Sequence, residues 1–264
     1  KRLCELMRRA HGKGARLVVF PELALTTFFP RWYMEDQAEV DTWFETEMPN
    51  AATRPLFDLA ASLKIGFYLG YAEKCVENGE VHRYNTSILV DADGKIVGKY
   101  RKVHLPGHSE YVPSYPWQHL EKRYFEVGNL GFPVWRTMGG IMGMCRCNAR
   151  RWPETYRVMG LQGAEVIMLG YNTPTQNRES NTIESPHLRM MHNQMSMQMG
   201  AYQNGCWVVG VAKAGAEDGF EMMGGSVICA PSGEIVAMAR TLGDELIVTD
   251  ADLDDCTFNK TTIF

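Results

Sequence analysis

The stretch IMGMCRCNARRWPE, residues 141–154, decides the fold of this chain. Its first half, from Ile141 to Cys147, has the apolar character of a buried strand, and a segment with helical periodicity begins at Pro153. Cys147 therefore stands where a strand ends and the chain turns toward a helix. In α/β folds, ligand-binding side chains lie at the carboxyl ends of strands. The stretch thus predicts an α/β protein with a thiol at the edge of its sheet.

Two other segments end in a reactive side chain in the same way. Glu22 follows the expected strand 16–20, and Lys102 ends the expected strand 96–102. A thiol nucleophile, a carboxylate base and an ammonium in one pocket have the chemistry needed to hydrolyse a C–N bond through an acyl-enzyme. We expect burial to raise the pKa of Glu22 and the following helix to lower the pKa of Cys147.

Strands and helices alternate along the rest of the chain. Helices are expected over residues 1–10, 55–63, 153–162 and 186–203. Further strands are expected over residues 65–71, 86–90, 164–169 and 206–211, around residues 227 and 235, and over 246–249. Residues 91–95 predict a hairpin turn, and residues 103–126 and 170–185 are long loops of the kind that carry function. We expect a single domain, residues 1–264, with mixed sheets covered by helices and doubled into a four-layer α-β-β-α sandwich.

The composition of the chain excludes several classes of function. The net charge is −4 at pH 7 and the lysines and arginines are scattered, which argues against nucleic acid as the main partner. No apolar run approaches the ~20 residues that would span a membrane. The seven cysteines are irregularly spaced and odd in number, which favours reduced thiols and a cytoplasmic location. Cys145 and Cys147 have no second pair at ligand spacing, so neither a metal nor another cofactor is expected.

The ordered trio of Glu22, Lys102 and Cys147, in its flanking sequences, resembles the nitrilase-like carbon–nitrogen hydrolases over essentially the whole chain. Longer stretches look most like the N-carbamoyl-D-amino-acid amidohydrolases of that superfamily: VVFPELALTTFFPRW (18–32), KYRKVHLPGH (99–108), QHLEKRYFE (118–126) and GYNTP (170–174). The resemblance implies a nitrilase-like fold in which the family's first strand and C-terminal extension are lacking. It also implies a homodimer or a homotetramer.

The resemblance further implies a mechanism that needs no cofactor. Glu22 takes the thiol proton, and Cys147 attacks the ureido carbonyl of a small carboxylated substrate, an N-carbamoyl-D-amino acid. Lys102 and the backbone N–H of Asn148 stabilise the oxyanion. Ammonia leaves, water attacks the acyl-enzyme, and the carbamate breaks down to carbon dioxide and the D-amino acid.

Other residues take roles from the same resemblance. Glu121 looks like the second carboxylate, which holds Lys102 and the base in position. Arg150 and Arg151 are suited to the substrate carboxylate, because a guanidinium fork pairs with it bidentately. The remaining side chains that fall where the family lines its pocket are those of His104, His119, Asn148, Asn172 and Thr173.

Two residues beside Cys147 depart from the family pattern. Ala149 stands where an acidic residue is usual, and Arg146 stands where an apolar one is usual. Burial of an unpaired guanidinium at position 146 is costly. Both departures support an alternative interpretation, a non-catalytic relative that keeps the fold. A second alternative is another amidase, a ureidopropionase or a nitrilase, because all of them use Glu, Lys and Cys. The paired arginines favour the carboxylated ureido substrate.

Overall fold

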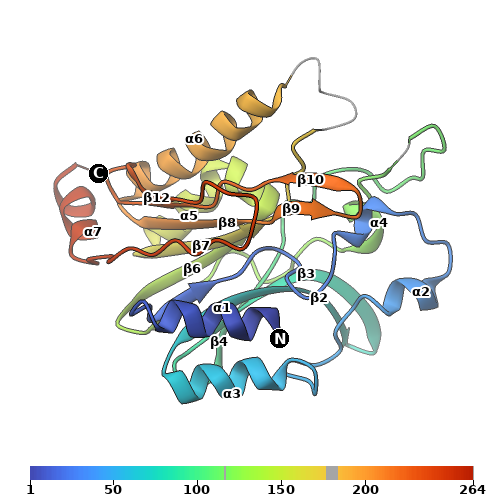
Figure 1. Cartoon of the computed structure of the whole chain (residues 1–264), viewed down its shortest axis with the longest axis horizontal. Coiled ribbons are helices and arrows are strands. Elements are labelled where there is room, and N and C mark those ends of the chain that lie inside the picture. The colour runs from blue at the N-terminus through green and yellow to red at the C-terminus, as the bar shows by residue number, and fades with distance from the viewer. Residues whose placement is uncertain (116, 177–183, 264) are drawn as a thin grey trace.

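The computed structural model describes residues 1–115, 117–176 and 184–263. Two sheets face each other, and helices cover the outer face of each, so that the chain has four layers. Figure 1 shows α1 (Arg2–His11) and α3 (Arg54–Leu63) on one outer side, and α5 (Pro153–Leu161) and α6 (Pro186–Asn204) on the other. The predicted fold class, an α-β-β-α sandwich of mixed sheets, is confirmed.

The first sheet has the strand order β1-β2-β3-β4, in which only the β1–β2 pair is parallel. Its strands are β1 (Leu17–Val19), β2 (Gly66–Glu77), β3 (Glu80–Val90) and β4 (Ile96–Arg101). The predicted turn at residues 91–95 joins β3 to β4, but β2 and β3 run several residues further than expected. Buried Met7 and Ala10 of α1 and Phe57 of α3 pack on this sheet. Burial of these apolar side chains fixes how the two amphipathic helices lie on the sheet.

The second sheet has the order β12-β11-β8-β7-β6-β5, with a parallel core of β6, β7 and β8. Its strands are β5 (Val134–Thr137), β6 (Gly140–Arg146), β7 (Val166–Tyr171), β8 (Trp207–Ala212), β11 (Val227–Cys229) and β12 (Ile235–Met238). The fully buried β7 and its apolar run explain why this part of the chain was predictable as strand. Ser185 caps α6 by accepting a hydrogen bond from the Leu188 N–H, which fixes where that helix begins.

The two sheets approach each other closely where the chain leaves β1. A Cβ on Gly170 would lie 2.4 Å from the backbone nitrogen of Glu22, so only glycine allows β7 to come so near. The Tyr68 hydroxyl of β2 donates to the Cys145 carbonyl of β6 at 3.2 Å and accepts from the Gly170 N–H at 3.2 Å. These contacts place the end of β1 directly against the ends of β6 and β7.

Several short elements that the sequence did not predict complete the chain. They are η1 (Phe29–Arg31), α2 (Gln37–Asp41), α4 (Glu121–Tyr124), η2 (Cys147–Arg151), the hairpin of β9 (Ala214–Glu217) and β10 (Phe220–Met223), α7 (Asp255–Phe258) and η3 (Asn259–Ile263). Figure 1 places β9, β10 and α4 at the same end of the molecule. The alanines and glycine of β9 carry little strand signal, which is why the hairpin was missed. Residues 177–183, in the middle of the expected loop 170–185, lie outside the described residues.

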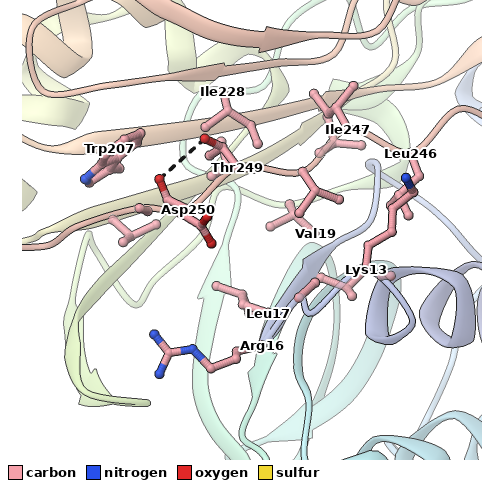
Figure 2. A pocket seen from close by; sticks show the side chains of 18 of the residues that line it. Lys13, Arg16, Leu17, Val19, Trp207, Ile228, Leu246, Ile247, Thr249 and Asp250 are labelled. Carbon is pink, nitrogen blue, oxygen red and sulfur yellow. Dashed lines mark hydrogen bonds between the residues drawn. The ribbon is translucent and has the colours of Figure 1, made fainter.

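The prediction of a strand over residues 246–249 was wrong. This segment forms no strand, although its apolar and β-branched residues favour one. It runs along a cavity, and Figure 2 shows Leu246 and Ile247 on one side of it with Leu17 and Val19 of β1 among the other side chains. Strand propensity gives a strand only where a neighbouring backbone offers hydrogen bonds. None of the predicted site residues lines this cavity.

None of the helices in the described part of the chain has the length and apolar character that a membrane crossing needs.

Candidate active site

The ends of three strands bring Glu22, Lys102 and Cys147 together. Glu22 follows β1 and Lys102 follows β4 of the first sheet, and Cys147 follows β6 of the second. Glu22 and Lys102 expose no surface, and Cys147 is 7% exposed. The Lys102 ammonium donates to Glu22 Oε1 at 2.9 Å and to Glu121 Oε2 at 2.6 Å. The structure therefore unites the three residues at the boundary between the two sheets.

Three hydrogen-bond donors stabilise Glu22 in its ionised form. Besides Lys102, the side-chain amide of Asn85 donates to Oε1 at 2.9 Å, and the Asn172 N–H donates to Oε2 at 3.1 Å. Burial by itself raises the pKa of Glu22, but the charges of Lys102 and Arg146 outweigh burial and lower it. The predicted rise of the Glu22 pKa was therefore wrong, because two cations from distant parts of the chain face this carboxylate.

Cys147 is a thiol in a backbone conformation that side chains rarely adopt. Its φ is +39°, in the left-handed region, at the first residue of the short 3-10 helix η2. Burial raises the pKa of the Cys147 thiol, and the negative charge of Glu22 raises it further, against the opposing charges of Lys102 and Arg150. The predicted lowering of this pKa was wrong, because burial dominates over the dipole of one short turn. A protonated thiol then lies beside an ionised carboxylate, the arrangement that a general base needs.

Lys102 remains an ammonium in spite of complete burial. Burial lowers its pKa, but the charge that Cys147 carries as a thiolate and the charges of Glu121 and Glu22 raise it above its ordinary value. Ligand atoms of Glu22, Glu121 and Cys147 lie within 4.8 Å of one another, close enough to share a metal ion. The Lys102 ammonium already bonds both carboxylates, so an internal cation compensates part of the negative charge of this acidic cluster.

A pocket opens onto Cys147 and contains seven of the predicted site residues. They are His119, Cys147, Asn148, Arg150, Arg151, Asn172 and Thr173. Glu121 lies behind them, and its Oε1 is 3.5 Å from Nε2 of His119. The ring of His119 packs edge-on against Phe28, with 5.5 Å between the ring centroids. Four of these residues belong to η2, which follows β6, two come directly after β7, and His119 lies in the long loop after β4, so the pocket is built where those strands end.

Arg150 and Arg151 differ in how they are held. Arg150 is buried, and its guanidinium donates to the Cys147 carbonyl at 2.7 Å and to Thr173 Oγ1 at 3.2 Å. It also lies over the ring of Tyr171 at 4.3 Å. Arg151 is exposed and has no hydrogen bond or ion pair with another residue of the described chain. Arg150 thus braces the nucleophile, and Arg151 is open to an anionic ligand.

Two further arginines line the pocket that sequence reasoning missed. Arg31 of η1 is buried, lies 3.7 Å from Asp218, and is 4.6 Å from the ring centroid of Phe220. Arg189 of α6 donates to the Pro174 carbonyl at 3.0 Å. The quoted stretch 18–32 contained Arg31, but nothing local indicated that the β9–β10 hairpin would hold it against the pocket. Four guanidinium groups therefore line this pocket, and among its lining residues Glu184 is the carboxylate.

His104 is the predicted pocket residue that the structure does not bring to this pocket. Its ring packs between Phe132 and Trp152, with centroids 5.9 and 5.8 Å away. It lines a separate surface hollow that Asn148 and Trp152 also border.

The two departures beside Cys147 have different surroundings. Ala149 is fully buried, and no side chain caps the start of η2. Arg146 is fully buried as well, but it is not an unpaired guanidinium: its Nε is 3.7 Å from Glu22 Oε1, and its Nη1 donates to the Thr86 carbonyl. The expectation that Arg146 is a costly isolated charge is thus corrected by the carboxylate that it faces.

Comparison with known proteins agrees with this geometry. A sequence profile of the carbon-nitrogen hydrolases matches residues 1–260. An N-carbamoylputrescine amidase from Oryza sativa subsp. japonica is 29% identical over 261 residues, which cover 95% of this chain and 79% of that protein. A nitrilase from Pyrococcus abyssi is 30% identical over 249 residues, which cover 94% of this chain and 81% of that protein.

One solved structure extends the agreement to the fold. The crystal structure of a carbon-nitrogen hydrolase from Helicobacter pylori G27 matches with a TM-score of 0.82 at 24% identity. The match covers 99% of this chain and 86% of that chain.

Proposed function

This chain belongs to the carbon-nitrogen hydrolase family, and from that premise we propose that it hydrolyses N-carbamoyl-D-amino acids to the D-amino acid, carbon dioxide and ammonia. The observation that carries the proposal is the pocket lined by four guanidinium groups that opens onto Cys147. Such a lining favours a substrate with a carboxylate, and the thiol favours attack on the carbonyl beside it.

The first half of the reaction forms a covalent acyl-enzyme. Glu22 takes the proton of the Cys147 thiol as its sulfur bonds to the ureido carbon. Lys102, which stays charged, stabilises the oxyanion together with the backbone N–H of Asn148. The carbon–nitrogen bond to the terminal amino group then breaks, and Glu22 returns its proton to that group, which leaves as ammonia. The carbamoyl carbon remains bonded to sulfur and to the nitrogen of the amino acid.

The second half releases the product. Water attacks the same carbon and gives a proton to Glu22, and the carbon–sulfur bond breaks as the thiol is restored. The product is the amino acid with a carboxylated nitrogen, which loses carbon dioxide without help from the protein. Since both halves use the same base, the placement of Glu22 between Asn172 and Lys102 serves each of them.

The charge of the pocket supports the carboxylated substrate over an amine. N-carbamoylputrescine ends in a primary amine, which is a cation at neutral pH. Of the four arginines that line the pocket, Arg189 pairs with Glu184 at 3.3 Å and Arg31 lies 3.7 Å from Asp218, and the arginines still outnumber the one lining carboxylate, which disfavours a cation. Arg151 supports a direct role in binding, because its guanidinium makes no hydrogen bond or ion pair with a described residue, although the negative charge of Glu184 acts on it. The D configuration rests on the stretches 18–32 and 99–108, which resemble N-carbamoyl-D-amino-acid amidohydrolases.

A substrate panel tests the proposal. We expect kcat/KM for N-carbamoyl-D-phenylglycine, measured by ammonia release, to exceed that for N-carbamoylputrescine by about 100-fold or more, because like charges across a binding site cost several kcal/mol. The L enantiomer and N-carbamoyl-β-alanine complete the panel, and Cys147→Ala is the control for background ammonia. Preference for N-carbamoylputrescine or for N-carbamoyl-β-alanine would contradict the proposed substrate, and the latter would identify a ureidopropionase.

A further inference from the structure

Arg146 lies in the site but takes no part in the proposed reaction steps. It is the last residue of β6, directly before the nucleophile, and its side chain is completely buried. Its Nη1 donates to the Thr86 carbonyl of β3, while Nε and Nη2 have no hydrogen-bond partner among the described residues. A buried guanidinium with two unsatisfied nitrogens is costly, so its presence calls for a reason beyond packing.

The neighbouring backbone makes room for this guanidinium. A Cβ on Gly70 of β2 would lie 1.9 Å from Arg146 Nη2, so any other residue at position 70 would displace the side chain. The space left by Gly70 lets the guanidinium reach Glu22, and Nε lies 3.7 Å from Oε1 of that carboxylate. Arg146 and Lys102 therefore both lie within 4 Å of the same oxygen, one from each sheet.

The charges around Glu22 balance only when Arg146 is counted. Glu22 and Glu121 are two carboxylates that share the Lys102 ammonium, which leaves one negative charge uncompensated. Two carboxylates that share one cation compete for it, and one of them then tends to bind a proton. Arg146 supplies the second positive charge, so that two cations face two anions.

Other charged groups near Glu22 do not replace this contribution. From η2, the Cys147 thiol is neutral while its proton remains bound. Lys213 lies after β8, and its ammonium bonds Glu217 at 2.5 Å. From the loop before α4, His119 approaches Glu121 rather than Glu22. Asn85 of β3 and Asn172 after β7 donate hydrogen bonds without a charge.

We propose that Arg146 is a positioning residue for the base: its guanidinium holds the Glu22 carboxylate ionised and aimed at Cys147, so that hydrolysis continues at a pH at which Glu22 would otherwise be protonated. This inference rests on the role of Glu22 as base in the proposed function. The lowered pKa of Glu22, in which the charge of Arg146 takes part, agrees with the geometry.

The test compares pH profiles of variants at position 146. We expect Arg146→Met to move the acid limb of kcat/KM to higher pH by about one unit or more, because an opposite charge at this distance shifts a carboxyl pKa by roughly 1–3 units. Arg146→Lys keeps the positive charge, so its acid limb is expected to lie closer to that of the wild type than the acid limb of Arg146→Met does. Alkylation of Cys147 by iodoacetamide, measured over the same pH range, reports the same base without any substrate.

The controls separate this role from a structural one. Arg101→Met also removes a buried guanidinium, but one that pairs with Glu73, so it is expected to lower Tm and to leave the acid limb in place. Gly70→Ala displaces the Arg146 side chain without changing its charge and serves if Arg146→Met does not fold. An acid limb of Arg146→Met that coincides with the wild type in both assays, or a shift in Arg146→Lys as large as that in Arg146→Met, would overturn the inference.

The two assays also separate this inference from the proposed function. If no ureido substrate is hydrolysed but the alkylation profile shifts as expected, the substrate proposal fails and the role of Arg146 stands.

Discussion

Arg101 and Lys102 are neighbours in sequence, are both buried, and enter two different clusters of charge. Arg101 Nε donates to Glu73 Oε2 at 2.9 Å, and Thr86 Oγ1 donates to the same oxygen at 2.7 Å. Glu73 Oε1 accepts from Lys99 at 2.5 Å, so both oxygens of this carboxylate are satisfied. The Arg101 cluster has the saturated hydrogen bonding of a structural ion pair.

The Lys102 cluster is built in the opposite way. Within the described residues, Glu121 Oε1 and two nitrogens of Arg146 have no hydrogen-bond partner. A thiol with a raised pKa lies beside them on a residue with φ of +39°. Each cluster holds a buried cation beside a buried carboxylate, and the two differ in how many polar atoms are left without a hydrogen bond. Open polar atoms and a strained backbone are typical of functional sites, in agreement with the chemistry that we propose for the Lys102 cluster.

The largest expected effect is a loss of kcat on replacement of Cys147 but not of the nearby Cys145. Cys147→Ala is expected to lower kcat by about 10⁴-fold or more, because the nucleophile is lost and only binding groups remain. Cys145→Ala is the matched control, since Cys145 is also buried but lies within β6 and forms no part of the pocket. Steady-state ammonia release from N-carbamoyl-D-phenylglycine measures both. Equal losses in the two variants would mean that the site had been disturbed as a whole.

Replacement of each cation by methionine tests the comparison of the two clusters. Lys102→Met and Arg101→Met each remove one cation from a buried carboxylate that keeps a second one, Arg146 beside Glu22 and Lys99 beside Glu73. Each is expected to lower the free energy of unfolding, by less than the ~3–5 kcal/mol that leaving a buried charge unpaired costs. Only Lys102→Met is expected to lower kcat as well, by about 100-fold or more, because it removes the charge that we propose stabilises the oxyanion. Urea unfolding and kcat are measured on the same preparations. A loss of kcat in Arg101→Met as large as that in Lys102→Met would contradict the assignment of a structural role to the Arg101 cluster and a catalytic role to the Lys102 cluster.

A smaller effect is expected at the mouth of the pocket. Arg151→Gln is expected to raise KM for N-carbamoyl-D-phenylglycine by about 10- to 100-fold, because a charge-assisted hydrogen bond contributes about 1.5–3 kcal/mol. The same variant is expected to leave KM for a neutral amide unchanged. Equal changes for both substrates would show that Arg151 shapes the pocket rather than binds the carboxylate.

The smallest effect concerns stability against pH in the structural cluster. Burial raises the pKa of Glu73, but hydrogen bonds from Arg101, Lys99 and Thr86 outweigh it and lower the pKa below its ordinary value. The stabilisation by Glu73 is therefore complete above its unfolded pKa and is lost as pH falls through its folded pKa. Glu73→Gln is expected to have a lower Tm than the wild type at pH 7, with the difference shrinking toward pH 3. A difference in Tm that is constant over this range would contradict the assignment.

The sequence was sufficient for what depends on neighbours along the chain. Glu22, Lys102 and Cys147 each follow a strand whose end is visible locally, and the carboxyl ends of strands converge in an α/β fold. The β-branched run at 246–249 shows the limit of this reasoning, because a strand also needs a partner that local sequence does not name.

Sequence was insufficient for what depends on distant groups. The direction of the Glu22 pKa is set by Lys102 and Arg146, which are 80 and 124 positions away along the chain. Arg31 reaches the pocket through the β9–β10 hairpin, a contact between segments almost 190 residues apart. Electrostatics and pocket composition thus follow from tertiary structure and not from any one segment.

In the proposed reaction Cys147 forms a covalent bond to the carbon that it attacks, and this intermediate can be trapped. N-carbamoyl-D-phenylglycine is mixed with the enzyme, the reaction is stopped with acid within the first turnover, and the digested protein is analysed by peptide mass spectrometry. We predict an adduct of the substrate less ammonia on the peptide that contains Cys147, and its absence in Cys147→Ala. Ammonia release from the wild type with the adduct on another residue, or with the adduct still present in Cys147→Ala, would contradict it.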